Sequence, residues 1–148
     1  MKIDDALRGV SILAFDTAPI IYFVEANPAY DALVSNIFNR VAAGAVQGRT
    51  SVITLSEVLV QPILASRGDL QEAYRDLLLK SSNFQTLPIS VSVAEDAARV
   101  RAQYGLRLPD ALQIAFAIST GCQAVVCNDY SMRRVTELPI LVLDDLEL

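Results

Sequence analysis

Histidine is absent from this chain of 148 residues, and cysteine is scarce. Without histidine, Ser-His-Asp and Cys-His nucleophilic chemistry is excluded, and a zinc site is poorly supported. The two cysteines, Cys122 and Cys127, have a spacing that fits no metal motif, and an isolated pair is weak evidence for a disulfide. We therefore expect both to be reduced residues of the core, where free cysteine usually lies.

Long apolar runs are missing as well. No stretch reaches the roughly 18 residues that span a bilayer, and the longest candidate, Ala111 to Ile118, is interrupted by Gln113. The N-terminal residues Met1 to Asp5 are acidic and lack the apolar segment of a signal peptide. These absences predict a protein of the cytoplasm that does not enter a membrane.

Composition limits the architecture further. Apolar residues make up 53% of the chain and charged residues 20%, which is typical of a compact globular protein rather than a disordered one. A length of 148 residues indicates a single domain over 1–148 with a core of its own, and the polar residues 1–10 are expected to form an N-terminal extension. The net charge of −5 argues against broad electrostatic capture of nucleic acid.

Short apolar or β-branched segments alternate with segments of helical periodicity along the chain. This alternation is typical of a parallel sheet covered by helices on both faces, which is an α/β fold. In such folds, ligands lie beyond the carboxyl ends of the strands. The strands are expected at 11–15, 50–53, 84–87, 124–127 and 140–143, and the longer helices at 20–25, 30–43, 55–65, 69–79, 92–104 and 109–120.

Four carboxylates fall where this fold would bring them together. Asp16 and Asp129 directly follow apolar strands, and Glu57 and Asp110 open helices at what should be the same edge of the sheet. A charge beside an apolar run is costly unless it meets a cation. Four acids facing one point would repel one another unless a divalent metal ion neutralised them, so this pattern predicts a metal site.

Each acid also has a purely structural explanation. Asp16 is a good helix N-cap, and Asp110 near a helix start gains about 0.3–1 kcal/mol from the helix dipole. Glu57 ends the capping box Thr54-Leu55-Ser56-Glu57, which would place it at the third helical position. Asp129 belongs to Asn-Asp, an ordinary turn pair. The case for function rests on the four acids together.

Polar neighbours of the acids are candidates for supporting roles. The hydroxyl of Thr17 suits the orienting of a carboxylate or of a water on the metal, and a turn contact explains it equally well. Asn128 directly precedes Asp129 and is expected to support it. Arg133 and Arg134 follow closely enough to reach phosphate, although an exposed basic pair is the default interpretation of such residues.

Four segments carry a resemblance to a known family. In order and across nearly the whole chain, they resemble the four motifs of the PIN domain, and in particular those of VapC-type toxins from prokaryotic toxin–antitoxin pairs. The segments are Phe15–Tyr22, Ile53–Val58, Leu108–Ala115 and Val126–Asp129. The resemblance implies a three-layer α/β/α sandwich and a Mg²⁺- or Mn²⁺-dependent ribonuclease. It further implies a homodimer, and an antitoxin protein that inhibits the enzyme at its site.

The resemblance also implies that Asp16, Glu57, Asp110 and Asp129 form the acidic pocket. Oxygen ligands suit a hard cation such as Mg²⁺ or Mn²⁺. The ion would activate water and offset charge on the phosphate, so no histidine base is needed. Asp16 and Asp110 are the best candidates for direct ligands, whereas Glu57 and Asp129 would bind directly, through water or with a second ion. Single-stranded or loop RNA is the expected substrate, because an exposed phosphodiester can enter a shallow pocket.

Other functions fit less well or remain open. An aspartate-phosphorylating hydrolase would need a second acid two residues after Asp16, where this chain has Ala18. A receiver domain would need a late lysine, but the only lysines are Lys2 and Lys80. The remaining alternative is a degenerate PIN domain that binds RNA or a protein partner without cleaving, and the intact acids count against it.

Overall fold

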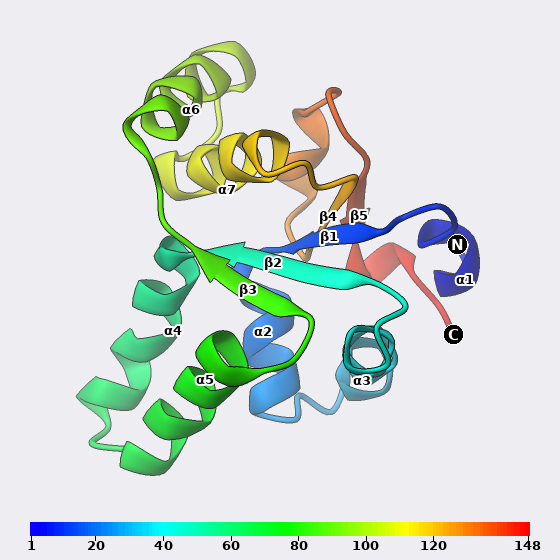
Figure 1. Cartoon of the computed structure of the whole chain (residues 1–148), viewed down its shortest axis with the longest axis vertical. Helices are drawn as coiled ribbons and strands as arrows, with labels where there is room; N and C mark the ends of the chain where they lie inside the picture. The colour runs from blue at the N-terminus through cyan, green and yellow to red at the C-terminus, as the bar shows by residue number, and fades with distance from the viewer.

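Five parallel strands form one sheet in the computed structural model, which describes all residues from Met1 to Leu148 (Figure 1). The strands lie in the order β3-β2-β1-β4-β5, and each pairs in parallel with its neighbours. The chain therefore builds outward from β1 on one side and returns to build outward from β4 on the other. β1 spans Ile12–Phe15, β2 Gln47–Ser51, β3 Phe84–Leu87, β4 Ala124–Cys127 and β5 Ile140–Val142.

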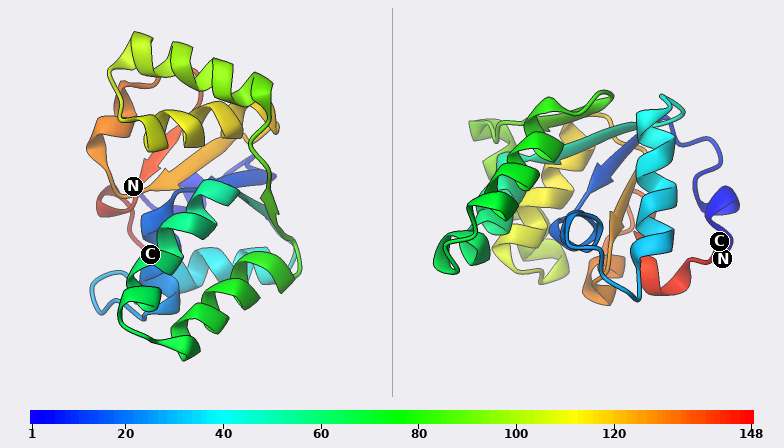
Figure 2. Two further views of the ribbon diagram at one scale, coloured as in Figure 1. Left: turned by 90° about the vertical axis from the view of Figure 1, so that its left-hand side faces the viewer. Right: turned by 90° about the horizontal axis from the view of Figure 1, so that it is seen from below.

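Helices cover both faces of this sheet, as Figures 1 and 2 show. One face is covered by α6 (Val91–Tyr104) and α7 (Leu108–Ser119). The other is covered by α2 (Thr17–Val24), α3 (Asp31–Ala42), α4 (Val52–Leu64) and α5 (Gly68–Lys80). None of the helices combines the length and the hydropathy needed to cross a bilayer. The predicted α/β fold, a three-layer α/β/α sandwich around a parallel sheet, is confirmed.

Strands β1 and β4, which pair with each other near the middle of the sheet, are buried on both faces, and this explains their continuous apolar sequences. Successive residues of β1 point to opposite faces: Leu13 and Phe15 join the core beneath α2, α3 and α5, and Ala14 joins the core beneath α6 and α7. In β4, Val126 lies on the first side and Cys127 on the second. Only the ends of these strands are therefore left to carry polar groups.

Aromatic side chains fill the larger of the two cores. The ring centroid of Phe38 lies 4.9 Å from that of Phe15 and 4.2 Å from that of Phe23. Phe84 from β3 closes the cluster, 5.4 Å from Phe15. Gly48 of β2 lies against this ring so closely that a Cβ atom would overlap the Cδ2 atom of Phe84. The close approach of the aromatic ring therefore requires glycine at position 48.

The two ends of the chain lie side by side (Figure 2). The single turn of helix α1 (Ile3–Ala6) buries Ile3, and Leu7 follows it into the larger core. The backbone N–H of Ile3 donates to the carbonyl of Glu147 at 2.8 Å. Residues 1–10 thus pack onto the sandwich through both apolar and backbone contacts.

One strand–helix boundary differs from its prediction. The β-branched run 50–53 predicts a strand and a helix from Leu55, whereas β2 ends at Ser51 and α4 begins with the next residue. The Ser51 hydroxyl caps this helix by accepting from the N–H of Ile53 at 3.2 Å. The predicted capping box that ends at Glu57 is therefore wrong. Glu57 lies in the second turn of α4, where no free backbone N–H explains a carboxylate.

Two other helices also start earlier than predicted. The helix expected at 92–104 begins one residue earlier, and Ser90 caps it by accepting from the N–H of Val93 at 3.1 Å. The helix expected at 69–79 begins at Gly68, and Asp69 forms an ion pair with Arg67 at 2.7 Å rather than a cap. Both differences are shifts of one turn or less at helix ends, where neighbouring polar residues compete for the same role.

Replacing Gly48 with alanine tests the packing of the aromatic core. Gly48→Ala forces a methyl group against the buried Phe84 ring, and overpacking of this kind costs about 1–3 kcal/mol. Gly68→Ala is the matched control, because a Cβ atom at position 68 meets no atom within 4 Å. Urea denaturation should show lower stability for the first variant and no loss for the second. A Gly48→Ala protein as stable as the wild type would contradict this packing.

Candidate active site

The strand order reverses between β1 and β4. Asp16 immediately follows β1, and Asn128 and Asp129 follow β4, so all three emerge at the carboxyl edge of adjacent strands. The backbone N–H of Asp16 donates to the carbonyl of Val126 at 3.0 Å, which fixes the two strand ends relative to each other. In open parallel sheets, such a reversal leaves a crevice in which ligands bind.

Two further acids reach the same crevice from helices. Glu57 comes from the second turn of α4, and Asp110 comes from the first turn of α7, where it is buried. The structure thus brings the six residues predicted from the sequence to one pocket of about 230 Å³. The pocket is lined by Asp16, Thr17, Ala18, Ile21, Glu57, Arg107, Asp110, Asn128 and Asp129.

A buried chain of hydrogen bonds runs behind the pocket. The Thr50 hydroxyl donates to the carbonyl of Phe15 at 2.8 Å and lies 2.8 Å from the hydroxyl of Thr54. Nε2 of Gln113 donates to Thr54 Oγ1 at 2.6 Å. The Ser51 hydroxyl donates to Oε1 of Gln113 at 2.8 Å. One continuous network therefore links β1, β2, α4 and α7.

This network joins the elements that carry three of the acids. Asp16 follows the β1 residue that accepts from the network, and Glu57 and Asp110 each lie one helical turn from a member of it. Its side chains are buried, so each polar atom depends on its partners rather than on water. Gln113 is a structural residue that the sequence does not reveal, since there it only interrupts an apolar run.

Asp16 is a carboxylate without a cationic partner in the protein. It stands at the N-cap position of α2, but its side chain makes no capping hydrogen bond, so capping does not explain it. Burial raises the pKa of Asp16 to about 6; the backbone N–H of Thr17 opposes this rise, and repulsion from the other three acids adds to it. The pocket therefore disfavours the charged form of Asp16 at neutral pH.

The other acids are partly satisfied. Asp110 accepts from Nε of Arg107 at 3.3 Å. Asp129 accepts from the backbone N–H of Ser131 at 2.8 Å at the start of the short 3-10 helix η1 (Tyr130–Arg134). Its pKa is lowered, chiefly by the side chain of Ser131 and to a smaller degree by this backbone hydrogen bond. The predicted turn role of Asp129 thus coexists with its place in the pocket. The pKa of Glu57 is raised, first by partial burial and then by the charge of Asp110, while Arg107 opposes the rise.

Asn128 is held on both sides of its amide group. Its Nδ2 donates to the hydroxyl of Tyr22 at 3.3 Å, and its Oδ1 accepts from the backbone N–H of Asp144 at 3.2 Å. Tyr22 stacks on Tyr30 with 4.4 Å between ring centroids, and the Tyr30 hydroxyl donates to Asp144 at 2.6 Å. These contacts fix the residue that directly precedes Asp129.

The pocket offers a donor set that fits a hard divalent cation, because its donors are oxygens of carboxylates, a hydroxyl and an amide. Thr17 Oγ1 is buried without a hydrogen-bond partner, an unusual state for a polar atom next to an unpaired carboxylate. As the side chains stand, no three His, Cys, Asp or Glu residues are arranged to hold one ion. Arg107 engages one oxygen of Asp110 and a backbone N–H engages one oxygen of Asp129, and some rearrangement of side chains is needed before one ion can share these acids with Asp16.

Arg107 lines the pocket but is not among the six residues predicted from the sequence. It is the N-cap residue of α7, its side chain is 78% exposed, and it is the one cationic residue of the lining. A signal does exist in the sequence. Arg107 stands three residues before Asp110, within pairing distance on a helix, at a helix start where positive charge is unfavourable.

Both cysteines are free and buried, as predicted. Cys127 ends β4 beside the acids, and burial raises its pKa to about 12. Burial also raises the pKa of Cys122. Both therefore remain neutral thiols at physiological pH, and a neutral thiol is a poor nucleophile and a poor metal ligand.

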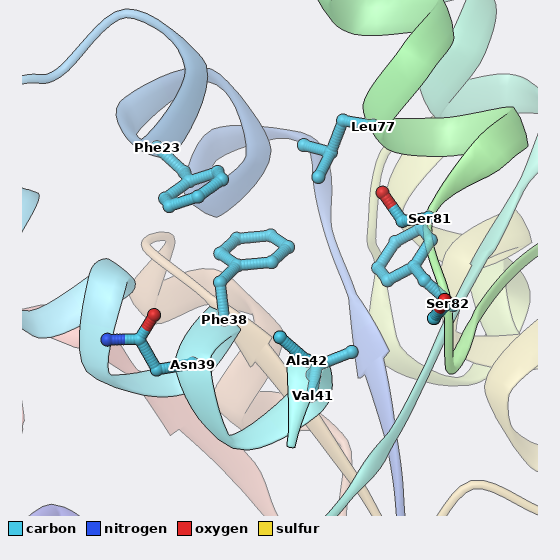
Figure 3. Close-up of a pocket in the computed structure, with 9 residues that line it drawn as sticks. Phe23, Phe38, Asn39, Val41, Ala42, Leu77, Ser81 and Ser82 are labelled. Atoms are coloured by element: carbon cyan, nitrogen blue, oxygen red, sulfur yellow. The ribbon is translucent and has the colours of Figure 1, made fainter. Parts of the chain in front are cut away.

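A second hollow, of about 410 Å³, lies among α2, α3, α5 and β3 (Figure 3). In Figure 3 the rings of Phe23 and Phe38 lie face to face on one side of it, and Leu77 lies across from them. Its lining consists of Phe23, Phe38, Asn39, Val41, Ala42, Leu77, Ser81, Ser82 and Phe84, none of which titrates near neutral pH. Acid–base and metal chemistry therefore belong to the acidic pocket.

Comparison with known proteins identifies the family of this chain. The family model described as PIN domain matches residues 13–138, a stretch that contains all four acids. The predicted likeness to the PIN domain is thereby confirmed. No curated protein sequence matches the chain.

Several solved toxin–antitoxin structures have the same fold. The chain is 25% identical to one in a toxin-antitoxin complex from Klebsiella pneumoniae, with a TM-score of 0.64 over 88% of this chain and 97% of that one. The chain is 19% identical to one in VapBC2 from Rickettsia felis, bound to a DNA fragment from its promoter, with a TM-score of 0.68 over 87% of this chain and 96% of that one. It is 16% identical to VapC20 from Mycobacterium tuberculosis, a sarcin-ricin loop cleaving toxin, with a TM-score of 0.67 over 86% of this chain and 98% of that one.

Removing Gln113 tests the buried network. Gln113→Leu leaves the hydroxyls of Ser51 and Thr54 without their amide partner, and a buried group left unpaired costs about 1–3 kcal/mol. Gln103→Leu is the control, because Gln103 is exposed on α6. The free energy of unfolding in urea should fall for Gln113→Leu only. Equal effects of the two substitutions would mean that the network contributes nothing specific.

The raised pKa of Asp16 makes stability depend on pH. The folded protein binds this proton more tightly than the unfolded chain, so stability is lost as pH rises from the ordinary pKa of 3.8 through about 6. At about 1.4 kcal/mol per pH unit, the penalty at neutral pH reaches about 3 kcal/mol. With a chelator present, Asp16→Asn should be more stable than the wild type at about pH 8 and equally stable at about pH 4. Urea denaturation at both pH values measures this, and a pH-independent difference would refute it.

Proposed function

This chain belongs to the PIN domain family, and on that premise we propose that it is a metal-dependent endoribonuclease, a hydrolase of RNA phosphodiesters. The proposal rests on one observation: four carboxylates from four different elements converge on a pocket at the switch point of a parallel sheet. Acids gathered in this way repel one another and destabilise a fold, and a divalent cation among them removes the penalty.

Each pocket residue has a role in this proposal. Asp16 and Asp110 would hold Mg²⁺ or Mn²⁺, and Glu57 and Asp129 would contribute directly, through water or with a second ion. The bound ion would supply the Lewis acidity needed to activate water and to offset charge on the phosphate. Thr17 orients a neighbouring carboxylate with the hydroxyl that has no partner in the protein.

The surroundings of the pocket favour a single-stranded substrate. Asn128 is clamped by Tyr22 and by the backbone of Asp144, so the turn that presents Asp129 is already in place before substrate binds. Glu57 is exposed at the rim, which leaves an entrance from solvent. An extruded phosphodiester of single-stranded or loop RNA can reach such a site, whereas a regular duplex holds its phosphates apart from it.

We further propose that the chain is the toxin of a toxin–antitoxin pair and acts in the cytoplasm. The structural likeness to toxin–antitoxin complexes supports an antitoxin protein as partner. On α4, the helix that carries Glu57, the side chains of Val60, Ile63 and Leu64 are 50%, 55% and 73% exposed. Exposed apolar side chains gathered on one helix suit a protein interface, with the antitoxin or with a second copy in a homodimer.

A PIN domain that binds RNA or a protein without cleaving is the weaker alternative. Such a domain has no need for four acids in one pocket, because carboxylates repel the phosphate backbone unless a cation is bound. The acids of this chain are all present and all line the pocket.

Incubation of the purified protein with total RNA tests the proposal. Cleavage should require Mn²⁺ or Mg²⁺, stop with a chelator, and fall by about 100-fold or more in Asp16→Asn, because the variant loses a ligand of the ion that offsets charge on the phosphate in the transition state. Asp5→Asn, which changes an exposed acid on α1, is the control and should cleave as the wild type does. Gel electrophoresis of the RNA provides the measurement.

Two different results would contradict the proposed ribonuclease activity. Equal cleavage by Asp16→Asn and the wild type would place the activity outside this pocket. No cleavage of any RNA by the wild type, together with no carboxylate-dependent binding of Mn²⁺, would favour the domain that binds without cleaving.

A further inference from the structure

The proposed function leaves one charged residue of the pocket without a role. Nε of Arg107 donates to Oδ2 of Asp110 at 3.3 Å, and the other guanidinium nitrogens have no hydrogen-bond partner in the protein. Charge-assisted hydrogen bonds of this type are usually about 2.7–2.9 Å long, so the contact is loose. The side chain of Arg107 is 78% exposed and that of Asp110 only 9%, so the arginine can leave without disturbing the core.

Arg107 acts as the counter-ion of the acidic pocket in this structure. Burial and Asp110 raise the pKa of Glu57, and Arg107 opposes that rise. Its charge also helps to lower the pKa of Asp129, after the larger effect of the hydrogen bond from Ser131. A divalent ion bound by the same carboxylates would lie within a few ångströms of the Arg107 guanidinium, and two cations at that separation repel each other. The guanidinium and a metal ion are therefore competitors for Asp110.

No other cationic residue lines the pocket. Nearby, Arg133 forms an ion pair with Asp145, and Nη1 of Arg134 donates to the carbonyl of Gly105 at 3.2 Å. RNA that enters the pocket brings phosphates toward several carboxylates. A guanidinium with free donors binds phosphate in a bidentate manner, so Arg107 is the lining side chain suited to that contact.

We propose that Arg107 is a phosphate-binding residue that changes partner: it pairs with Asp110 in the metal-free protein, and it moves to the phosphate backbone of bound RNA when a divalent ion takes Asp110. This inference rests on the proposed function. It follows that removing Arg107 strengthens metal binding in the absence of RNA. It also follows that the contact between Arg107 and RNA forms only with metal bound, so metal and RNA strengthen each other's binding.

Titration of the protein with Mn²⁺, followed by electron paramagnetic resonance of the free ion, tests the competition. Arg107→Gln should bind Mn²⁺ about fivefold more tightly than the wild type, which is the lower end of usual couplings between sites. Arg99→Gln is the matched control: it removes an exposed arginine that also pairs with an aspartate three residues away, on α6 outside the pocket. The affinity of this control for Mn²⁺ should equal that of the wild type.

The salt dependence of RNA binding tests the change of partner. The probe is a short labelled 2′-O-methyl RNA oligonucleotide, shown by electrophoresis to stay intact, and binding is followed by fluorescence anisotropy. With Mn²⁺, the slope of log affinity against log salt should shrink by about 0.7 in Arg107→Gln, which corresponds to one phosphate contact with a single strand. Without Mn²⁺, the two slopes should be equal. Arg107→Lys should retain most of the slope with Mn²⁺, because an ammonium group also contacts phosphate.

Two results would overturn the inference. One is an affinity of Arg107→Gln for Mn²⁺ no higher than that of the wild type. The other is a change of slope that is the same with and without Mn²⁺, which would make Arg107 a fixed contact. Failure of the proposed function looks different, because the wild type then binds no Mn²⁺ and cleaves no RNA, and both proposals fall. If only the inference is wrong, metal-dependent cleavage persists and Arg107→Gln behaves as Arg99→Gln does.

Discussion

The buried hydrogen bonds among Phe15, Thr50, Thr54, Ser51 and Gln113 are the constraint on which the pocket depends. Apolar contacts alone allow a helix to slide or rotate on a sheet at little cost, since they have no direction. A buried hydroxyl or amide is satisfied in very few positions, and leaving it unpaired is expensive. The network therefore fixes how α4 and α7 stand relative to the end of β1, and with them the three acids that these elements carry.

The pocket itself works against folding, and its acids are compensated to different degrees. Asp129 has a backbone N–H, Asp110 has an exposed arginine, and Asp16 has no cationic partner. The two apolar cores on either side of the sheet supply the stability that offsets this repulsion. Such a division is common in proteins, because groups placed for a ligand are seldom the groups that stabilise the empty site.

Much of the fold and of the pocket is predictable from the sequence, because local patterns of apolar residues report burial. Contacts between distant residues leave no such local pattern and are not predictable in this way. Apolar strands and periodic helices reflect burial on both faces of a sheet, and parallel strands end at one edge, so six pocket residues could be placed together. The start of α4 was not predictable, because its first two residues are β-branched and only the cap by Ser51 and the tertiary contacts decide against a strand. Gln113 bonds to residues 62 and 59 positions away, and no local pattern identifies such partners. The pairing of Arg107 with Asp110 follows from their separation of three residues on a helix, but the position of Arg107 in the pocket depends on the tertiary fold.

Two buried thiols flank β4, and their chemical reactivity can be used to follow local opening of the chain at each end of this strand. Cys122 lies just before it and Cys127 closes it beside the acids, and both are protonated and shielded from solvent. A thiol in that state reacts with an alkylating reagent only when the chain around it opens, so its rate of modification measures the free energy of local opening. The native protein can thus be monitored at the switch point of its sheet without an introduced label. A ligand that tightens the pocket would slow the reaction of Cys127 more than that of Cys122, and so separate closure of the site from a general gain in rigidity.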